Sequence, residues 1–502
     1  MPPSRPPAGP TPAGPTSDSP APAGPAPSGP GPPARAERRW RLVLVLAGSA
    51  LVSFQGGLLR IAFPVIRDDL EAGIPAMQAV SLGGLLATTA TVVAFGRLAD
   101  VAGARRVYAG GLAVFAAGSV LSAAAPGAGA LVGAQVFQGL GWAMVLSSGT
   151  PLLVGGFDPD HRGRAVAASH MAIALGLAGG PALGGVLVDR YGWRAALVVL
   201  APAAVGVAAL VLARIPSGPG PAGPRRDFDL AGSAGLALAL TCVLVAVEGR
   251  QRLGPGQLAA LAMLGAGALG AFVAHERRTA DPMLDLGLFG RRAFTAGLAA
   301  ASLNFAAMTS NMFLLPFFLQ EALGYEVAEA GLFMVVVPLG IVVAAPVAGW
   351  LTDRSGPRLP ATTGTALITA GIVLMAGFGA DVSPLHLVAV LGAYGLGAGL
   401  FQSPNITGVL AAAPADRLGV ASGALSTVGR LGQVVGVALA GGLWERGAGA
   451  SGGAGAGAAG FRTAFLALAV CGGLATAASW LRGPTAPADG APEAGAVVPV
   501  PH

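Results

Sequence analysis

The chain has 502 residues, of which 54% are hydrophobic and only 11% are charged, with a formal net charge of +6. Soluble domains carry about 25% charged residues, so this composition excludes an ordinary water-soluble protein. All 30 basic residues are arginines amid abundant alanine, glycine and proline, which indicates a compositional bias of the genome rather than a nucleic-acid-binding surface. Both cysteines lie in apolar runs, so we expect no disulfide framework, metal site or cofactor.

The two ends of the chain differ from everything between them. Residues 1–41 begin as a Pro/Ala/Gly-rich tract and residues 482–502 form a shorter one, so both are predicted to be disordered cytoplasmic tails. Between them, stretches such as 42–59 and 230–247 contain no charged residue. A run of about 20 apolar residues spans a bilayer, and unpaired backbone groups are not tolerated in lipid, so each run predicts a transmembrane helix.

Apolar runs separated by charged or Pro/Gly-rich breaks predict an all-α integral membrane protein with fourteen transmembrane helices. The predicted spans are 42–66, 76–98, 106–125, 128–153, 164–188, 193–214, 229–248, 256–274, 293–320, 328–352, 358–380, 384–412, 417–443 and 461–481. With the amino terminus inside, 21 of the 30 arginines fall in cytoplasmic segments and 7 on the other side. This bias follows the positive-inside rule and predicts a multi-pass protein of the inner (plasma) membrane with both termini cytoplasmic.

A charged loop follows the second span. Gly96 and Gly103 permit a tight turn, which would place Asp100 opposite Arg105 and Arg106. Taken alone, this segment is equally well explained as a helix-ending turn with solvated charges. The end of the tenth span repeats the pattern at Gly349, Asp353, Arg354, Gly356 and Arg358. A motif that recurs at matching places in two halves is typical of an internally duplicated transporter.

The fifth span carries a row of small residues. Gly176, Gly180 and Gly184 are four residues apart and form a flat stripe on which another helix can pack closely. Pro181 removes a backbone hydrogen bond and favours a bend, and Gly185 follows one residue after the stripe. On physical grounds alone, this row of small residues indicates a surface for helix packing.

Together, these segments resemble the major facilitator superfamily, specifically its fourteen-helix drug:proton antiporter branch of multidrug and secondary-metabolite exporters. Residues 176–185 match the antiporter motif GxxxGPxxGG, and residues 96–106 resemble the loop motif. The resemblance implies two pseudo-symmetric six-helix bundles, 42–214 and 293–481, joined by a linker, 215–292, that carries two extra central helices. It also implies a cavity open to each side in turn, with the two charged loops acting as a conformational latch.

The first and fourth spans depart from the family pattern. Aligned on residues 62–64, the family's membrane-embedded aspartate falls on Gln55 and its asparagine on Arg60. The arginine that the family links to proton coupling falls on Gln135. Loss of one partner alone would leave a buried unpaired charge at a cost of several kcal/mol, so loss of both favours a coherent change of the coupling site.

Other polar residues are candidates for contact with substrate or a coupling ion. No acidic residue is predicted at mid-membrane, so His170 and Glu321 are the groups that could change protonation; the alternatives are an interfacial histidine and a solvated carboxylate. Arg430 either faces the cavity or donates to helix carbonyls, and Arg60 either faces the cavity or reaches the outer interface. If both face the cavity, an acidic substrate is expected. Further candidates are Asn304, Asn311, Gln402 and Asn405.

The expected function is secondary active export of drugs or secondary metabolites by alternating access, with proton-linked antiport. An uptake carrier for an anionic metabolite, driven by another ion, is one alternative, and a non-transporting scaffold or sensor is another. An enzyme is not expected, because the five histidines are scattered and form no catalytic or metal-ligand spacing. The expected partners are a small-molecule substrate, a proton or other coupling ion and the lipid bilayer, with no nucleic acid and with the chain as a monomer.

Overall fold

The computed structural model describes residues 35–155, 157, 159–216, 253–276, 286–379, 381–414, 418–451 and 456–483, together with five isolated positions between 235 and 245. Every regular element within these residues is helical. Most of the predicted span 229–248, and the tail residues 1–34 and 484–502, lie outside the described residues.

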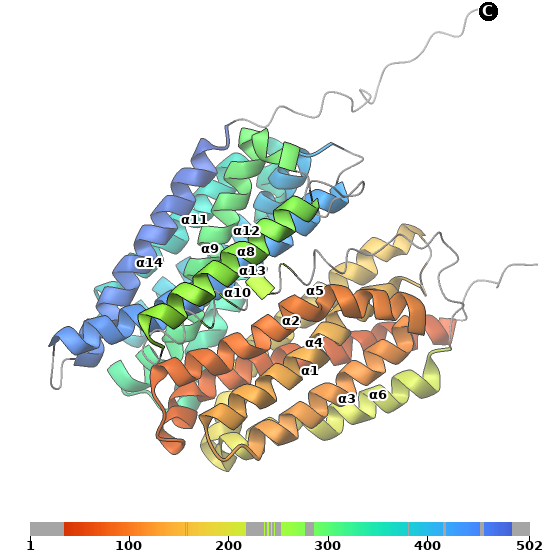
Figure 1. The fold of residues 1–502 in the computed structure, drawn as a ribbon, viewed down its shortest axis with the longest axis horizontal. Coiled ribbons are helices and arrows are strands. Elements are labelled where there is room, and N and C mark those ends of the chain that lie inside the picture. Colours follow the sequence, from red (N-terminus) through yellow and green to blue (C-terminus); the bar gives the residue numbers. More distant parts are fainter. Residues whose placement is uncertain are drawn as a thin grey trace, which may run out of the picture.

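The helices form two bundles with one helix beside them (Figure 1). The N-terminal bundle comprises α1 (Arg35–Asp69), α2 (Ile74–Ala102), α3 (Ala104–Ala123), α4 (Ala128–Val154), α5 (Pro159–Val198) and α6 (Leu200–Arg214). The C-terminal bundle comprises α9 (Arg292–Phe317), α10 (Val327–Ser355), α11 (Arg358–Ala376), α12 (Pro384–Ala411), α13 (Leu418–Ser451) and α14 (Ala456–Leu481). The remaining elements are α8 (Pro255–Glu276), the 3-10 turn η2 (Leu286–Gly290) and the π-helical turn η3 (Phe318–Ala322).

Helix boundaries follow the charge breaks of the sequence, with one correction. Residues 35–41, expected in the disordered tail, belong to α1, where Arg41 Nε donates to Glu37 Oε1 at 2.9 Å and so pairs charges one helical turn apart. α5 extends to Val198 but is broken by a kink at Gly192, whose φ of 76° is not helical, and this break lies between the predicted spans 164–188 and 193–214. Among the described residues, eleven helices are long and apolar enough to cross a membrane, or twelve with one bent pair. The count of fourteen stays a prediction.

The two bundles repeat one packing pattern. In the N-terminal bundle α1 packs on α5 and α6, while α4 packs on α2 and α3. In the C-terminal bundle α9 packs on α13 and α14, while α12 packs on α10 and α11. Between the bundles, α5 contacts α10 and α13 contacts α2, which are equivalent pairs. The structure is therefore pseudo-symmetric, as a duplicated sequence predicts.

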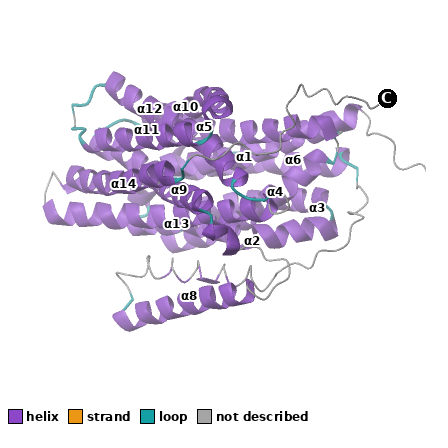
Figure 2. Ribbon diagram, turned by 90° about the horizontal axis from the view of Figure 1, so that it is seen from above, coloured by secondary structure: helices purple, strands orange, loops and turns teal. Residues whose placement is uncertain are grey.

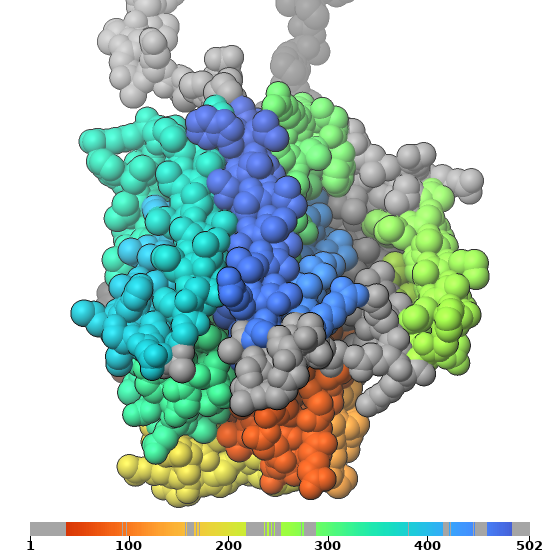
Figure 3. Space-filling view, turned by 90° about the vertical axis from the view of Figure 1, so that its left-hand side faces the viewer, coloured from red at the N-terminus to blue at the C-terminus, as the bar shows by residue number. Residues whose placement is uncertain are grey.

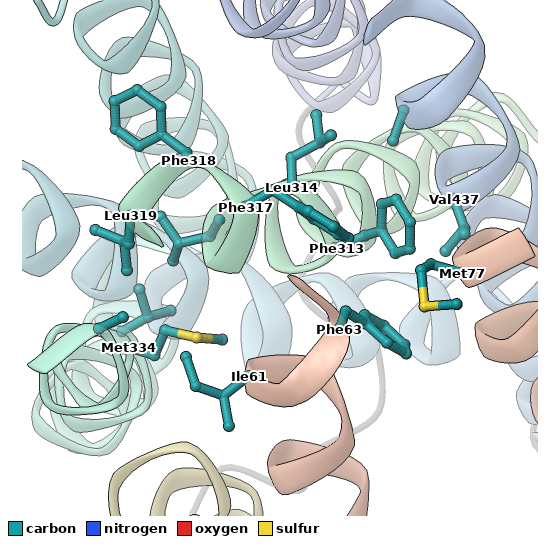
Figure 4. Packing of buried hydrophobic residues seen from close by; sticks show 14 of the residues in the cluster. Ile61, Phe63, Met77, Phe313, Leu314, Phe317, Phe318, Leu319, Met334 and Val437 are labelled. Atoms are coloured by element: carbon teal, nitrogen blue, oxygen red, sulfur yellow. The ribbon is translucent and has the colours of Figure 1, made fainter. Parts of the chain in front are cut away.

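Among the described residues, the contacts between the two bundles gather at one end. We name the end where α1 begins and α14 finishes the terminal face, and the opposite end the distal face. Near the distal face, a single hydrophobic cluster runs through both bundles and includes Phe63, Met77, Phe313 and Val437 (Figure 4). Figure 3 views this end, where the N-terminal bundle lies against the C-terminal bundle. Toward the terminal face the buried hydrophobic residues form two separate clusters, one in each bundle.

The helix α8 lies apart from both bundles (Figure 2). It makes no extensive contact with any other described helix. Its side chains include the exposed Met263, Leu264 and Leu269, an arrangement suited to lipid rather than to water. α8 therefore lies beside the bundles and does not enter the interface between them.

A charged cavity between the two bundles

A cavity of about 540 Å³ lies between the bundles. Residues of α1, α2, α3, α4 and α5 line one side, and residues of α9, α12 and α13 line the other. Among the lining residues that the structure describes, none is Asp, Glu or His. The cavity wall is mostly apolar, with aromatic rings at Phe115, Trp142, Phe305 and Phe401.

Two arginines line this cavity, one from each bundle. Arg60 is on α1 and Arg430 is on α13, and both side chains are partly exposed. No described residue forms a hydrogen bond or an ion pair with either guanidinium group. Of the alternatives open for Arg60, the structure favours the cavity over the outer interface. Two positive charges thus face one mostly apolar cavity without a counter-ion among the described residues.

The amides that replace the family's acid/base pair belong to two neighbouring networks in the N-terminal bundle. The Ser119 hydroxyl on α3 donates to Gln55 Oε1 at 2.9 Å and accepts from Gln138 Nε2 at 2.8 Å. Gln135 Nε2 donates instead to Ser122 Oγ at 2.9 Å. Gln55 is 2% exposed, and its Nε2 atom has no partner among the described residues. Both glutamines line the cavity, but each is tied to α3 and not to the other.

The asparagine and glutamine candidates of the C-terminal bundle separate into two groups. Gln402 and Asn405, both on α12, line the cavity. Asn304 and Asn311 on α9 are each 1% exposed and are not part of its wall. Asn304 Nδ2 donates to Met308 Sδ at 3.3 Å, a contact within one helix. The structure therefore brings two of these four candidates to the cavity.

The distal end of the cavity is sealed by aromatic rings. Phe63 on α1 lies at the cavity wall, with its ring centroid 5.6 Å from that of Phe313 on α9. The ring of Phe317 stacks on Phe63 at 6.5 Å and completes a three-ring seal across the bundles (Figure 4). Such rings exclude water from the distal end of the cavity.

Polar contacts surround this seal. Arg67 Nη1 lies 2.7 Å from Glu321 Oε1, and the Arg67 guanidinium group stands 5.8 Å from the centroid of the Phe317 ring. Gln320 Nε2 donates to the carbonyl oxygen of Ile61 at 2.9 Å. On the other flank, Gln78 Nε2 of α2 donates to Val437 O of α13 at 2.5 Å. Each contact joins one bundle to the other, so the distal face is closed in this conformation.

The motif over residues 176–185 packs on two different helices. A Cβ added at Gly176 or Gly180 would collide with carbonyl oxygens of α1, and one at Gly184 would meet Leu58 of α1 at 2.9 Å. Gly185 faces the other bundle, where a Cβ would lie 2.7 Å from Val327 O of α10. Pro181 serves both, because its carbonyl oxygen abuts Gly331 of α10 and its ring packs on Gly57 of α1. Part of the motif thus belongs to the contact between the bundles.

The two charged loops lie on the terminal face. Asp100 and Asp353 are exposed, and neither pairs with a residue that the structure describes. The expected contact of Asp100 with Arg105 and Arg106 is not formed here: Arg105 donates to the carbonyl oxygen of Leu212, and Arg106 is exposed. Gly103 turns the chain between α2 and α3 with a φ of 91°.

In the second loop, each arginine is held within its own bundle. Arg354 stacks 4.3 Å from the Trp350 ring centroid, and Arg358 Nε donates to Trp480 O at 3.0 Å. Gly356, with a φ of 73°, ends α10, and Gly349 precedes it within that helix. The corresponding Gly96 lies within α2.

One predicted candidate, His170, is in α5, but its side chain lies outside the described residues.

Sequence reasoning missed several residues of this site. The pairing of Arg67 with Glu321 and the cavity position of Trp142 carry no sequence signal beyond residue type. Arg482, expected in a disordered tail, is instead 2% exposed, and its Nη2 donates to Asn405 Oδ1.

Comparison with known proteins agrees with this architecture. The model of the Major Facilitator Superfamily matches residues 45–437 and 297–501. A riboflavin transporter of Clostridioides difficile is 30% identical over 79% of this chain and 86% of its own length, and a probable actinorhodin transporter of Streptomyces coelicolor is 32% identical over 82% and 73%. A bacterial homologue of the lysosomal transporter Spinster, in an inward-facing and unoccupied conformation, has a TM-score of 0.66 at 14% identity, covering 90% of this chain and 98% of that one.

The fold and the cavity between two duplicated bundles define a membrane transporter. The chain belongs to the major facilitator superfamily. Its relatives include proteins named as drug, antibiotic and secondary-metabolite exporters.

Proposed function

We propose that this transporter exports acidic, amphipathic small molecules by proton-linked alternating access. In the proposed orientation, the terminal face and both termini are cytoplasmic in the inner (plasma) membrane, and the chain acts as a monomer. The conformation described here would then be the inward-facing one, in which cytoplasmic substrate reaches the cavity. The seal at Phe63, Phe313 and Phe317 supports this assignment, because it closes the opposite end.

The observation that carries the substrate class is the pair Arg60 and Arg430, which line the cavity from opposite bundles without an acidic neighbour among the described lining residues. In a site of low dielectric, a carboxylate or phenolate would satisfy both guanidinium groups, whereas a cation would be repelled by them. The rings of Trp142 and Phe305 supply apolar surface for the rest of such a molecule. A planar acid therefore fits this wall better than the cationic drugs handled by many relatives.

Proton coupling has to use a group other than the replaced pair. Gln55 and Gln135 are neutral amides at every physiological pH. His170 and Glu321 stay the candidates for the proton-binding group, Glu321 being part of the distal seal. Asp100 and Asp353, which pair with no described residue in this conformation, are proposed to form their latch contacts when the terminal face closes.

The test uses three probes that share a naphthalene ring: 1-naphthoate, neutral 1-naphthamide and cationic 1-naphthylmethylamine. The full chain in proteoliposomes is assayed for flux of each probe, with and without an imposed proton gradient. Arg60→Gln and Arg430→Gln are expected to reduce naphthoate transport by about tenfold or more, since each removes a charge-assisted contact. The exposed Arg190→Gln of α5 is the matched control.

Three outcomes count against the proposal. Equal loss for all three probes would show that the arginines act structurally and not on substrate charge. Flux of naphthoate that ignores the proton gradient would remove the antiport part of the proposal. Absence of flux for every probe would favour a scaffold or sensor.

A further inference from the structure

A buried arginine lies behind the cavity wall of the C-terminal bundle. Arg482 directly follows α14 and is 2% exposed, which places it among the largest fully buried side chains of the described chain. Its guanidinium group does not reach the cavity itself, because Arg482 is not among the lining residues. It is thus a third positive charge close to the site, in addition to Arg60 and Arg430.

Two glycines make room for this side chain. A Cβ at Gly408 of α12 would collide with Nη1 of Arg482, and a Cβ at Gly297 of α9 would lie 3.1 Å from its Nη2. The guanidinium group is therefore confined between α9 and α12. Of its nitrogens, Nη2 donates to Asn405 Oδ1, whereas Nε and Nη1 have no partner among the described residues.

The contact with Arg482 fixes the orientation of the Asn405 amide. A guanidinium group only donates, so the atom of Asn405 that it meets has to be the carbonyl oxygen. The Nδ2 amino group, with two donors, is then the polar end of Asn405 that is left for the cavity, which this residue lines. With a neutral or apolar neighbour at position 482, either end of the amide could face the cavity.

The choice of an amide at position 405 is informative. Burying an arginine without a carboxylate is costly, and an aspartate of the same size at position 405 would supply the missing counter-ion. It would also place an acceptor and a negative charge at the cavity wall. With asparagine at this position, Arg482 has no carboxylate partner among the described residues, and position 405 can present a donor to the cavity instead.

We propose that Arg482 is a positioning residue of the substrate site, which holds the Asn405 amino group toward the cavity to donate to the acidic group of the substrate. This inference rests on the proposed function, because it assumes an acidic substrate. It assigns a specificity-determining role to a residue that lies outside the cavity and directly follows α14. The contact is made within one bundle and so does not require either face to open.

The decisive variant is Asn405→Asp, which keeps the size of the side chain and its contact with Arg482. Binding of 1-naphthoate and 1-naphthamide to the purified full chain is measured by titration calorimetry. We expect naphthoate to bind about tenfold or more weakly, since a donor to its carboxylate becomes a like charge, while naphthamide changes by less than about threefold. The melting temperature should stay equal or rise, since the buried arginine gains an ion-pair partner.

A double-mutant cycle tests whether Arg482 acts through Asn405. Arg482→Met should weaken naphthoate binding by about three- to tenfold in the natural background and by less than about twofold in an Asn405→Ala background. Arg482→Lys retains a donor for Asn405 Oδ1 and should restore part of the affinity. If Arg482→Met fails to fold, Asn405→Asp carries the test, because Arg482 stays in place.

The outcomes separate this inference from the proposed function. If Asn405→Asp binds naphthoate as tightly as the natural chain, or if the effects of the two positions are additive, the positioning role is wrong while acid selectivity stands. If the natural chain shows no preference for naphthoate over naphthamide, the proposed substrate class is wrong and the inference fails with it. A fall in melting temperature with equal loss of both probes would assign the pair a structural role only.

Discussion

The Nη1 atom of Arg67 lies 2.7 Å from Oε1 of Glu321, and this ion pair joins α1 of the N-terminal bundle to the π-helical turn after α9 of the C-terminal bundle. The two side chains are 19% and 26% exposed, so the pair is neither fully hydrated nor fully buried. Because its partners belong to different bundles, it can exist only while the distal face is closed. It therefore stabilises one conformation relative to the other.

Neutralising this pair should shift the conformational equilibrium. We expect Glu321→Gln to destabilise the closed distal face by about 1–3 kcal/mol, between the values typical of exposed and buried pairs, which corresponds to a population shift of about 5- to 150-fold. The distance between spin labels at Val101 and Leu359 on the terminal face, measured by pulsed electron resonance, should shorten. Cys242 and Cys471 are first replaced with serine.

The matched control for this shift is Asp69→Asn. Asp69 Oδ2 pairs with Arg194 Nη1 at 2.5 Å near the same face, but both residues belong to the N-terminal bundle. The label distance should therefore stay unchanged. An equal response of both variants would mean that loss of a surface charge, and not of the contact between bundles, drives the change.

The glycine at the contact between α5 and α10 should control closure in a different way. A methyl group at Gly331 would collide with Pro181 O, so Gly331→Ala is expected to disfavour the closed distal face by about 1–3 kcal/mol, as overpacking does elsewhere. Gly392 of α12 is the control, since a Cβ there meets Val336 at an ordinary 3.8 Å. Both variants should fold, and the label distance should shorten only for Gly331→Ala. Unchanged distances would show that this contact does not limit closure.

The charged loop on the terminal face should act in the opposite direction. If Asp100 forms its latch contacts only when this face closes, Asp100→Asn removes about 0.3–1 kcal/mol from that state and lengthens the mean label distance. Combined with Glu321→Gln, it should return the distance toward that of the natural chain. A shorter distance for Asp100→Asn alone would rule out the latch.

Placing a carboxyl group at the cavity should add a pH dependence to the binding of an anion. Among the described lining residues, only arginines are charged, so these residues by themselves give the affinity for naphthoate no slope between about pH 5.5 and 8. In Gln55→Glu the new carboxyl group loses its proton as the pH rises, and the resulting carboxylate repels the anionic probe. The affinity for naphthoate should therefore fall toward alkaline pH and recover on acidification. Titration calorimetry across this range is the measurement. A sloping profile in the natural chain would reveal a titrating group near the site.

The sequence predicted helix limits well where charge breaks are sharp. The predicted span 384–412 is found as Pro384–Ala411, because Ser383 accepts a hydrogen bond from the backbone nitrogen of His386 and starts the helix. At the amino terminus the prediction began too late, since the helix of Arg41 extends back to Arg35 beyond the apolar run. Hydropathy identifies the apolar part of a helix that spans the membrane, but it does not show how far polar residues continue the same helix.

Position along a helix did not decide how the arginines of the site are placed. The sequence left open whether Arg60 faces the cavity or reaches the outer interface, and in the structure Arg60 lines the cavity between the bundles. Whether an arginine meets lipid, water or protein depends on neighbouring helices that are distant in sequence. The same holds for Arg482, which is buried because Gly297 and Gly408 leave space on two other helices. Contacts of this kind cannot be predicted from the residues that neighbour each arginine in the sequence.

The charge of Arg60 and Arg430, which has no counter-ion among the described lining residues, has an electrical consequence. The unloaded carrier would hold net positive charge within the insulating layer of the membrane, where each elementary charge moved across the full voltage exchanges about 2.3 kcal/mol per 100 mV. With the proposed orientation and a negative cell interior, that voltage would draw the empty protein back toward the state in which the terminal face is open. A bound anion would cancel part of this positive charge. The membrane voltage would then oppose the change to the outward-facing state less in the loaded carrier than in the empty one.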